Sequence, residues 1–113
     1  MSREWRMYLR DMIDCCDRIL EYTDGVTREE FDRHGLVYDA TVRKIELLGE
    51  AARYVPEEVR GQAPEIAWRE MIGTRNVLVH GYFGIDDDIL WDIVRNKAGP
   101  LKAALEELDR RQP

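Results

Sequence analysis

Apolar residues recur at intervals of three and four along most of this chain, and that spacing constrains the fold more than any other feature. In the first twenty residues the apolar positions that follow this spacing are Trp5, Leu9, Met12, Ile13, Cys16, Ile19 and Leu20. This period places them on one side of an α-helix. There are no alternating apolar and polar runs of the kind that indicate β-strands, and no internal repeats. The sequence predicts an all-α protein, a single domain over residues 1–113 built as an antiparallel bundle of four or five helices.

Residues that cap or stop helices predict the boundaries in the first half of the chain. Ser2 is a candidate cap for the first helix. Thr27, followed three residues later by Glu30, forms a capping box that starts a short helical turn. A long helix is expected over residues 36–55, and Pro56 stops it.

The same signals organise the second half. Pro64 suits the first turn of a helix expected over about residues 65–80. Three consecutive aspartates at 86–88 favour the start of a further helix, where they complement its dipole, over a metal site. Gly99 and Pro100 predict a break or kink in that helix.

Charge and cysteine content exclude several classes of protein. The net charge of −6 rules out a generic basic coat for nucleic acid but leaves room for a local basic pocket. The longest uncharged run is far shorter than a membrane-spanning helix, and the N-terminal residues do not resemble a signal peptide. Cys15 and Cys16 are adjacent and cannot easily bridge each other, so we interpret them as reduced thiols near a helix core. These observations indicate a cytoplasmic protein.

The helical pattern breaks at one place, where Arg75 and Asn76 fall on the stripe of residues 65–80 expected to face the core. Such side chains are costly to bury unless they are paired, so this break marks a candidate functional site. His80 lies five residues after Arg75, about 140° around an ideal helix, so the two do not share a face. The spacing alone is also compatible with a structural role for both residues, in which Arg75 lies at an interface and His80 lies at a helix C-terminus.

The wider sequence around these residues is more specific. From Pro64 to Val94 it reads PEIAWREMIGTRNVLVHGYFGIDDDILWDIV, after a helix carrying IELLGEAARYVPEEVR. It resembles the HepT-like branch of the HEPN superfamily, small helical toxins encoded beside a minimal nucleotidyltransferase. The resemblance covers Tyr38 to Leu108, and its diagnostic element is Arg75-Asn76-x-x-x-His80-x-Tyr82.

The resemblance implies a metal-independent endoribonuclease without a cofactor, acting on RNA in a cleft between the two chains of a homodimer. In that role His80 would exchange protons, Arg75 would hold two phosphate oxygens, and Asn76 would orient the histidine or the phosphate. Two paired chains would supply a separate acid and base. His34 lies outside the motif and is interpreted as a surface histidine.

The resemblance also implies how the toxin is controlled. In related type VII-like toxin–antitoxin pairs, the nucleotidyltransferase antitoxin transfers AMP to the motif tyrosine, which is Tyr82 here, and so silences the toxin. Without the resemblance, Tyr82 could equally be a half-buried residue that closes a turn. The alternative function is a non-catalytic helical module that binds and positions a nucleotidyltransferase, with Arg75 and His80 holding a nucleotide or an interface. The acidic net charge favours this alternative, and the complete motif favours the ribonuclease.

Overall fold

A computed structural model describes residues 4–73 and 86–113 of the chain. Every regular element in these two ranges is helical, which confirms the predicted all-α class. None of the described helices is long and apolar enough to cross a membrane. The elements are α1 (Trp5–Thr23), α2 (Arg28–Phe31), α3 (Leu36–Ala52), α4 (Glu57–Arg60), α6 (Asp87–Asp92), the π-helical turn η1 (Ile93–Lys97) and α7 (Ala98–Arg110). A further helical segment covers residues 68–73.

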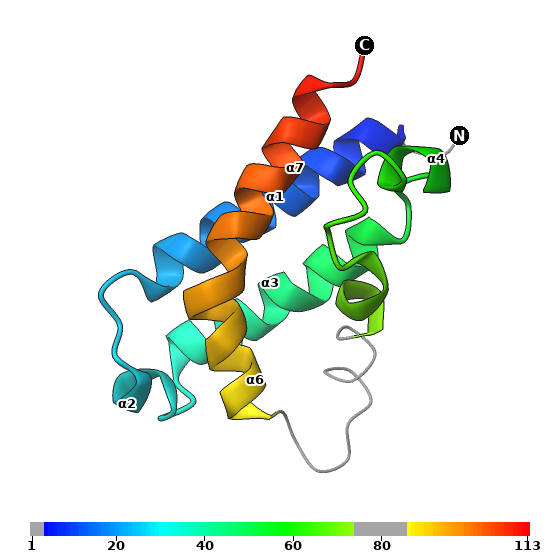
Figure 1. The fold of residues 1–113 in the computed structure, drawn as a ribbon. Helices are drawn as coiled ribbons and strands as arrows, with labels where there is room; N and C mark the ends of the chain where they lie inside the picture. The colour runs from blue at the N-terminus through cyan, green and yellow to red at the C-terminus, as the bar shows by residue number, and fades with distance from the viewer. Residues whose placement is uncertain (1–3, 74–85) are drawn as a thin grey trace.

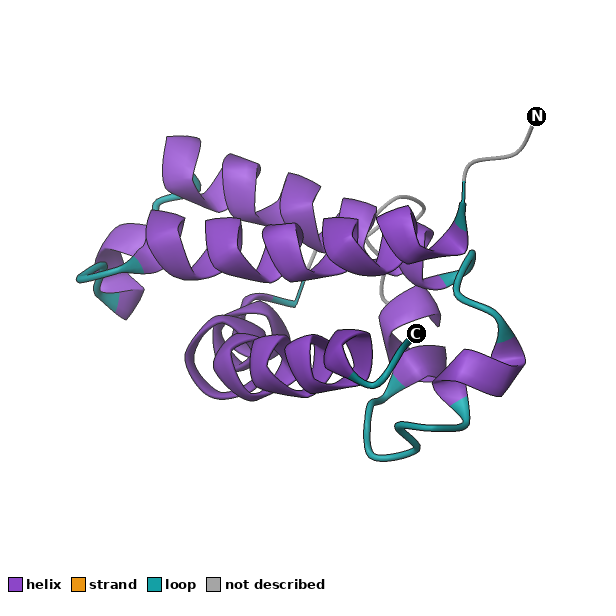
Figure 2. Ribbon diagram, turned by 90° about the horizontal axis from the view of Figure 1, so that it is seen from above, coloured by secondary structure: helices purple, strands orange, loops and turns teal. Residues whose placement is uncertain are grey.

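The three long elements form two layers. Helices α1 and α3 run antiparallel and side by side, joined at one end by a connection that contains α2 (Figure 1). α6, η1 and α7 follow one another as a single helical rod that packs against this pair (Figure 2). The two ends of the described chain lie close together, where Arg6 of α1 hydrogen-bonds to Asp109 Oδ1 at 3.0 Å and to the Pro113 carbonyl oxygen at 2.6 Å.

Of the boundary signals in the first half of the chain, one is confirmed and two are displaced. The Thr27 hydroxyl accepts a hydrogen bond from the backbone N–H of Glu30, as the capping box predicts. Helix α3 ends at Ala52, three residues before the predicted end at residue 55. Glu4, rather than the predicted Ser2, is the N-cap of α1, and Ser2 lies outside the described residues.

The helix predicted to start at residue 65 starts later, at residue 68. The preceding residues form turns, with the Ile66 N–H donating to the Ala63 carbonyl at 3.1 Å. The Trp68 indole N–H donates to that same carbonyl, also at 3.1 Å. Burial of Ile66 and Trp68 therefore favours a folded-back turn over the extra helical turn that Pro64 would permit.

Gly99 and Pro100 do not break the last helix, contrary to the prediction. Both lie in the first turn of α7, and the irregularity precedes them in η1, where the Ala98 N–H donates to the Ile93 carbonyl five residues earlier. Proline has no N–H and its ring crowds the preceding turn. A wider π-helical turn directly before it accommodates both effects, so the rod continues.

Two clusters of buried apolar side chains hold the layers together. The first lies where α1, the end of α3, the connector around α4 and α7 meet, and its largest members are Leu9, Met12, Trp68, Leu105 and Leu108. The second joins the end of α1, α2, the start of α3 and the rod, and contains Ile19, Phe31, Tyr38, Ile45, Leu90, Val94 and Ala98. Both clusters draw on residues from opposite halves of the sequence.

The two cysteines are buried as predicted. Cys15 is 5% exposed and Cys16 is fully buried, and both are free thiols. Burial is the main reason that the pKa of Cys15 rises to about 11 and that of Cys16 to about 12. Because the thiolate is the reactive form, these cysteines are packing residues at neutral pH.

Thr41 is fully buried in α3, and its hydroxyl has no hydrogen-bond partner among the described residues. Because an unsatisfied buried hydroxyl is destabilising, we expect Thr41→Val to raise the free energy of unfolding by up to about 1 kcal/mol. Thr23 is the matched control, since it is equally buried but donates to the Ile19 carbonyl at 2.8 Å. Urea unfolding measures both variants. A loss of stability in Thr41→Val as large as that in Thr23→Val would contradict the assignment.

Candidate functional site

The four residues of the predicted site, Arg75, Asn76, His80 and Tyr82, lie outside the described residues. Their predicted roles therefore stay predictions. The structure does describe the chain on both sides of them, up to residue 73 and again from Asp86 onward.

On the N-terminal side of the motif, the helical segment over residues 68–73 begins at a buried tryptophan. Trp68 is 8% exposed and belongs to the first core cluster, so the helical segment over residues 68–73 begins at a buried, hydrogen-bonded residue. Met71 and Ile72 pack against the same cluster. Because aromatic burial contributes strongly to stability, this anchor fixes the start of the segment on the bundle.

On the C-terminal side, each of the three aspartates has a different partner. Asp86 caps α6 by accepting from the backbone N–H groups of Asp88 and Ile89 at 2.9 and 3.2 Å, which confirms the predicted cap. The Asp88 carboxylate pairs with Arg28 of α2 at 2.5 Å. No group of three or more His, Cys, Asp or Glu side chains within the two described ranges is arranged to hold a metal ion.

The third aspartate, Asp87, lies at the centre of a polar cluster with His34 and Tyr38. The Tyr38 hydroxyl donates to Asp87 Oδ1 at 2.7 Å, and His34 Nε2 lies 2.6 Å from Oδ2. The imidazole also stacks on the Tyr38 ring, with 3.9 Å between centroids. We refer to these three residues as the His34 cluster. His34 is half-exposed, as expected for a surface histidine, but it also links two distant parts of the chain.

The electrostatics of the His34 cluster are consistent with an ionised carboxylate. Burial by itself raises the pKa of Asp87, but the hydrogen bonds from Tyr38 and His34 outweigh it and hold that pKa below its usual value. Burial, together with the bond to Asp87, raises the pKa of Tyr38. The phenol therefore stays protonated as a donor, and the carboxylate stays charged as an acceptor.

Sequence reasoning did not find this cluster. His34 and Asp87 are 53 residues apart in the chain, so no helical period or short motif connects them. The one feature of the local sequence that indicates a turn at His34 is the glycine that follows it, Gly35, which directly precedes α3.

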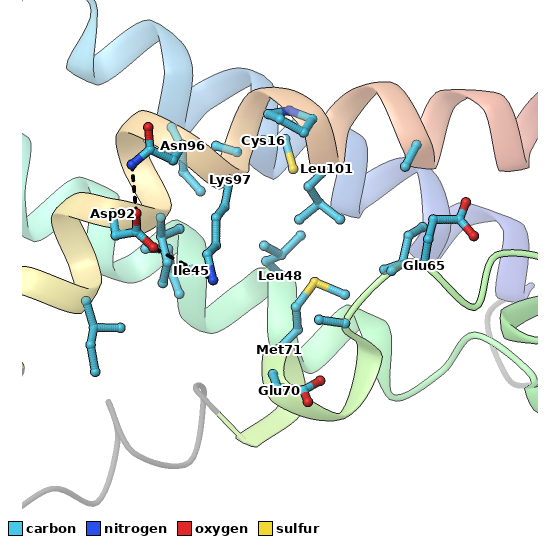
Figure 3. A pocket seen from close by; sticks show the side chains of 18 residues that line it. Cys16, Ile45, Leu48, Glu65, Glu70, Met71, Asp92, Asn96, Lys97 and Leu101 are labelled. Carbon is cyan, nitrogen blue, oxygen red and sulfur yellow. Dashed lines mark hydrogen bonds and ion pairs between the residues drawn. The ribbon is translucent and has the colours of Figure 1, made fainter.

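A groove of about 500 Å³ lies between residues 65–71 and the rod of α6, η1 and α7 (Figure 3). Cys16, Ile45 and Leu48 contribute to its apolar lining. Charged and amide groups also line it, and two of them contact Asp92, namely the Asn96 amide at 2.7 Å and the Lys97 ammonium group at 3.7 Å. These polar groups of the rod are therefore paired with one another.

The chain is similar to a known protein family and to several named proteins. The family described as "Ribonuclease HepT-like" matches residues 12–108. A protein of Methanocaldococcus jannaschii named "Putative RNase MJ1380" is 35% identical over 105 residues, which cover 93% of this chain and 96% of that protein. The "Probable ribonuclease HepT" of Thermococcus cleftensis is 35% identical over 108 residues, covering 96% of this chain and 98% of that protein.

No solved structure gives a significant match to the chain. The family match and these relatives cover almost all of the sequence, including the whole segment between the described ranges. They confirm the resemblance inferred from the motif, and the chain belongs to the ribonuclease HepT-like family.

Proposed function

We propose that this protein is an endoribonuclease that cleaves RNA without a metal ion, with Arg75, Asn76 and His80 as its catalytic residues. The observation that carries the proposal is the motif Arg75-Asn76-x-x-x-His80-x-Tyr82, which lies within the span matched by the ribonuclease family. The relatives named as RNases cover the same residues.

The residue types suit this reaction. His80 takes the proton of a 2′-hydroxyl, whose oxygen attacks the adjacent phosphorus, and the bond from phosphorus to the 5′-oxygen breaks. A second protonated histidine returns a proton to the leaving 5′-oxygen, so the products are a 2′,3′-cyclic phosphate and a 5′-hydroxyl. Arg75 neutralises the charge that builds on the phosphorane oxygens, through a bidentate guanidinium. Side chains thus supply both the proton transfer and the positive charge.

The direct test is cleavage of a labelled RNA by the purified protein in the presence of excess EDTA. We expect cleavage at an unchanged rate, with 2′,3′-cyclic phosphate ends identified by mass spectrometry. Loss of cleavage in EDTA, with recovery on addition of Mg²⁺ or Mn²⁺, would contradict the metal-independent reaction.

The second histidine comes from a partner in this proposal, because the motif contains a single histidine. We therefore expect a two-fold symmetric homodimer, the commonest symmetry of small oligomers. Light scattering should give twice the chain mass of 13.3 kDa at micromolar concentration. A mass of one chain across that concentration range would refute the shared cleft.

We further propose that the protein is the toxin of a cytoplasmic toxin–antitoxin pair and that a nucleotidyltransferase silences it by transferring AMP to Tyr82. The added phosphate would place negative charge and bulk beside the catalytic residues, where RNA phosphate must bind. Tyr38 is a poor acceptor because it is 6% exposed and its hydroxyl donates to Asp87.

Co-expression with the partner nucleotidyltransferase should add one AMP per chain, and Tyr82→Phe should prevent this addition and keep the protein toxic, because the phenol oxygen is the acceptor. Tyr54→Phe is the matched control, since Tyr54 is 53% exposed and should leave the modification unchanged. Intact-mass and peptide mass spectrometry locate the AMP. Its presence on another residue, or modification of the Tyr82→Phe protein, would overturn the assignment.

A non-catalytic binding module for the nucleotidyltransferase is the second candidate, favoured by the net charge of −6, which repels RNA. In that case the protein would bind the nucleotidyltransferase but would not cleave RNA, whatever the molar ratio of protein to nucleotidyltransferase. The cleavage assay in EDTA separates the two functions.

A further inference from the structure

The His34 cluster joins three separate elements through a single carboxylate. His34 belongs to the connection between α2 and α3, Tyr38 to the first turns of α3, and Asp87 to the first turn of α6. Both carboxylate oxygens are used, one by the Tyr38 hydroxyl at 2.7 Å and the other by His34 Nε2 at 2.6 Å. An ionised carboxylate only accepts hydrogen bonds, so both partners donate to it. The first turn of α6 is thereby attached to α3.

The backbone of His34 has a conformation that residues other than glycine rarely adopt. Its φ angle is +56°, in the left-handed region that favours glycine. The next residue, Gly35, has an ordinary φ of −88°. A glycine at position 34 would adopt the observed backbone more easily, so the contacts of the His34 side chain are what favour histidine there.

The neighbours of Asp87 reinforce the attachment. Asp86 caps the helix, and the Asp88 carboxylate pairs with Arg28, which also binds Asp32 at 2.9 Å. The start of α6 is therefore held to α2 as well as to α3. The three carboxylates at the start of α6 that make these contacts, Asp86, Asp87 and Asp88, are the first three residues after the point where the described chain resumes.

That point is close to the motif in sequence. His80 and Tyr82 precede Asp86 by six and four residues. Six residues of chain span at most about 20 Å, so the motif is joined to the start of α6 by a short covalent link. Catalysis by positioned groups is sensitive to small displacements, since a shift of about 1 Å can cost about a hundredfold in rate.

We propose that His34, Tyr38 and Asp87 are positioning residues for the ribonuclease, which fix the start of α6 and through it the approach of the motif to its substrate. This inference rests on the proposed function and adds three residues outside the motif to it. In this role the cluster acts through the start of α6 and not through contacts with RNA. Its loss therefore lowers kcat while KM for RNA stays nearly constant.

The test compares the steady-state cleavage of one RNA oligonucleotide by several full-length variants. Asp87→Asn removes the charge of the acceptor, Tyr38→Phe removes one donor and keeps the ring, and His34→Gly removes the imidazole and relieves the backbone. We expect each variant to lose about tenfold or more in kcat, with KM within about twofold of wild type. Circular dichroism and thermal unfolding confirm that each variant is folded at the assay temperature.

Two further variants separate positioning from general stability. Lys102→Met removes an ion pair of 2.5 Å between α7 and Asp17 of α1, far in sequence from the cluster, and should leave kcat unchanged. His34→Gln places an amide N–H at a reach similar to that of Nε2 and should recover part of the kcat lost in His34→Gly. Because the variants compared are all folded at the assay temperature, a loss of stability alone would not lower their kcat.

The outcomes distinguish the two hypotheses. If wild type does not cleave RNA above the rate seen without protein, the proposed ribonuclease is overturned, and the positioning role falls with it. If His80→Ala is inactive while folded Asp87→Asn and His34→Gly keep the wild-type kcat, only the positioning role is overturned. An equal loss of kcat in Lys102→Met would also overturn it.

Discussion

Replacing His80 with alanine is expected to reduce RNA cleavage by at least about a thousandfold and to abolish toxicity to growing cells. A general acid or base contributes about 10² to 10⁴ to the rate, and in a symmetric dimer the substitution removes both the base and the acid of the cleft at once. The helical circular dichroism should stay unchanged, because the proposed role of His80 is chemical. Cleavage is measured with the purified variant and a labelled RNA, and toxicity by growth after induction.

The arginine of the motif supplies the accompanying comparison. Arg75→Ala should be as inactive as His80→Ala, whereas Arg75→Lys keeps the charge but loses the bidentate geometry and should retain part of the activity. Full cleavage by purified His80→Ala protein would exclude the assigned role. An active Arg75→Ala variant would exclude the role of the guanidinium in neutralising phosphate charge.

Trp68→Ala is expected to be the most destabilising of the single substitutions considered. Trp68 is 8% exposed, packs in the first core cluster and donates its indole N–H to the Ala63 carbonyl. Removing a buried aromatic ring costs about 3–5 kcal/mol in lost transfer energy and cavity formation, and here it also leaves a carbonyl without its donor. This is a large share of the roughly 5–15 kcal/mol by which domains are stable, and thermal unfolding should shift down by about 10–25 °C.

Two milder substitutions make this result interpretable even if Trp68→Ala does not fold. Trp68→Phe keeps most of the ring and loses the N–H, so we expect a smaller loss of about 1–2 kcal/mol. Leu36→Ala is the exposed control, since Leu36 is 84% exposed, and it should change stability by less than about 0.5 kcal/mol. Chemical unfolding followed by circular dichroism measures all three variants. A Trp68→Ala protein as stable as Leu36→Ala would show that the turn over residues 63–68 is not anchored by the tryptophan.

Family membership and the chemistry of the site rest on different evidence. The family follows from a match over residues 12–108, which the motif and its surrounding residues already indicated. The catalytic roles proposed for Arg75 and His80 rest on what their side chains can do. The structure adds the anchors on both sides of the motif, namely Trp68 before it and the His34 cluster after it.

Features that depend on near neighbours in the chain could be predicted from the amino-acid sequence alone. The all-α class follows from apolar residues three and four apart, because that period matches one helix face. The caps made by Thr27 and Asp86 were predictable because a capping side chain reaches backbone N–H groups only two or three residues ahead. The motif was visible for a similar reason, since its residues lie within eight positions of one another.

Features that depend on partners far apart in the chain could not be predicted in this way and are seen in the folded protein. Residues 65–67 do not extend the following helix because the buried Trp68 folds back onto Ala63. The rod continues past Pro100 because a π-helical turn absorbs the missing N–H, and packing against α1 holds that turn in place. His34 meets Asp87 across 53 residues because α3 and α6 pack together in the second core cluster. Contacts of this kind are set by how helices pack, and helix periodicity alone does not specify which faces meet.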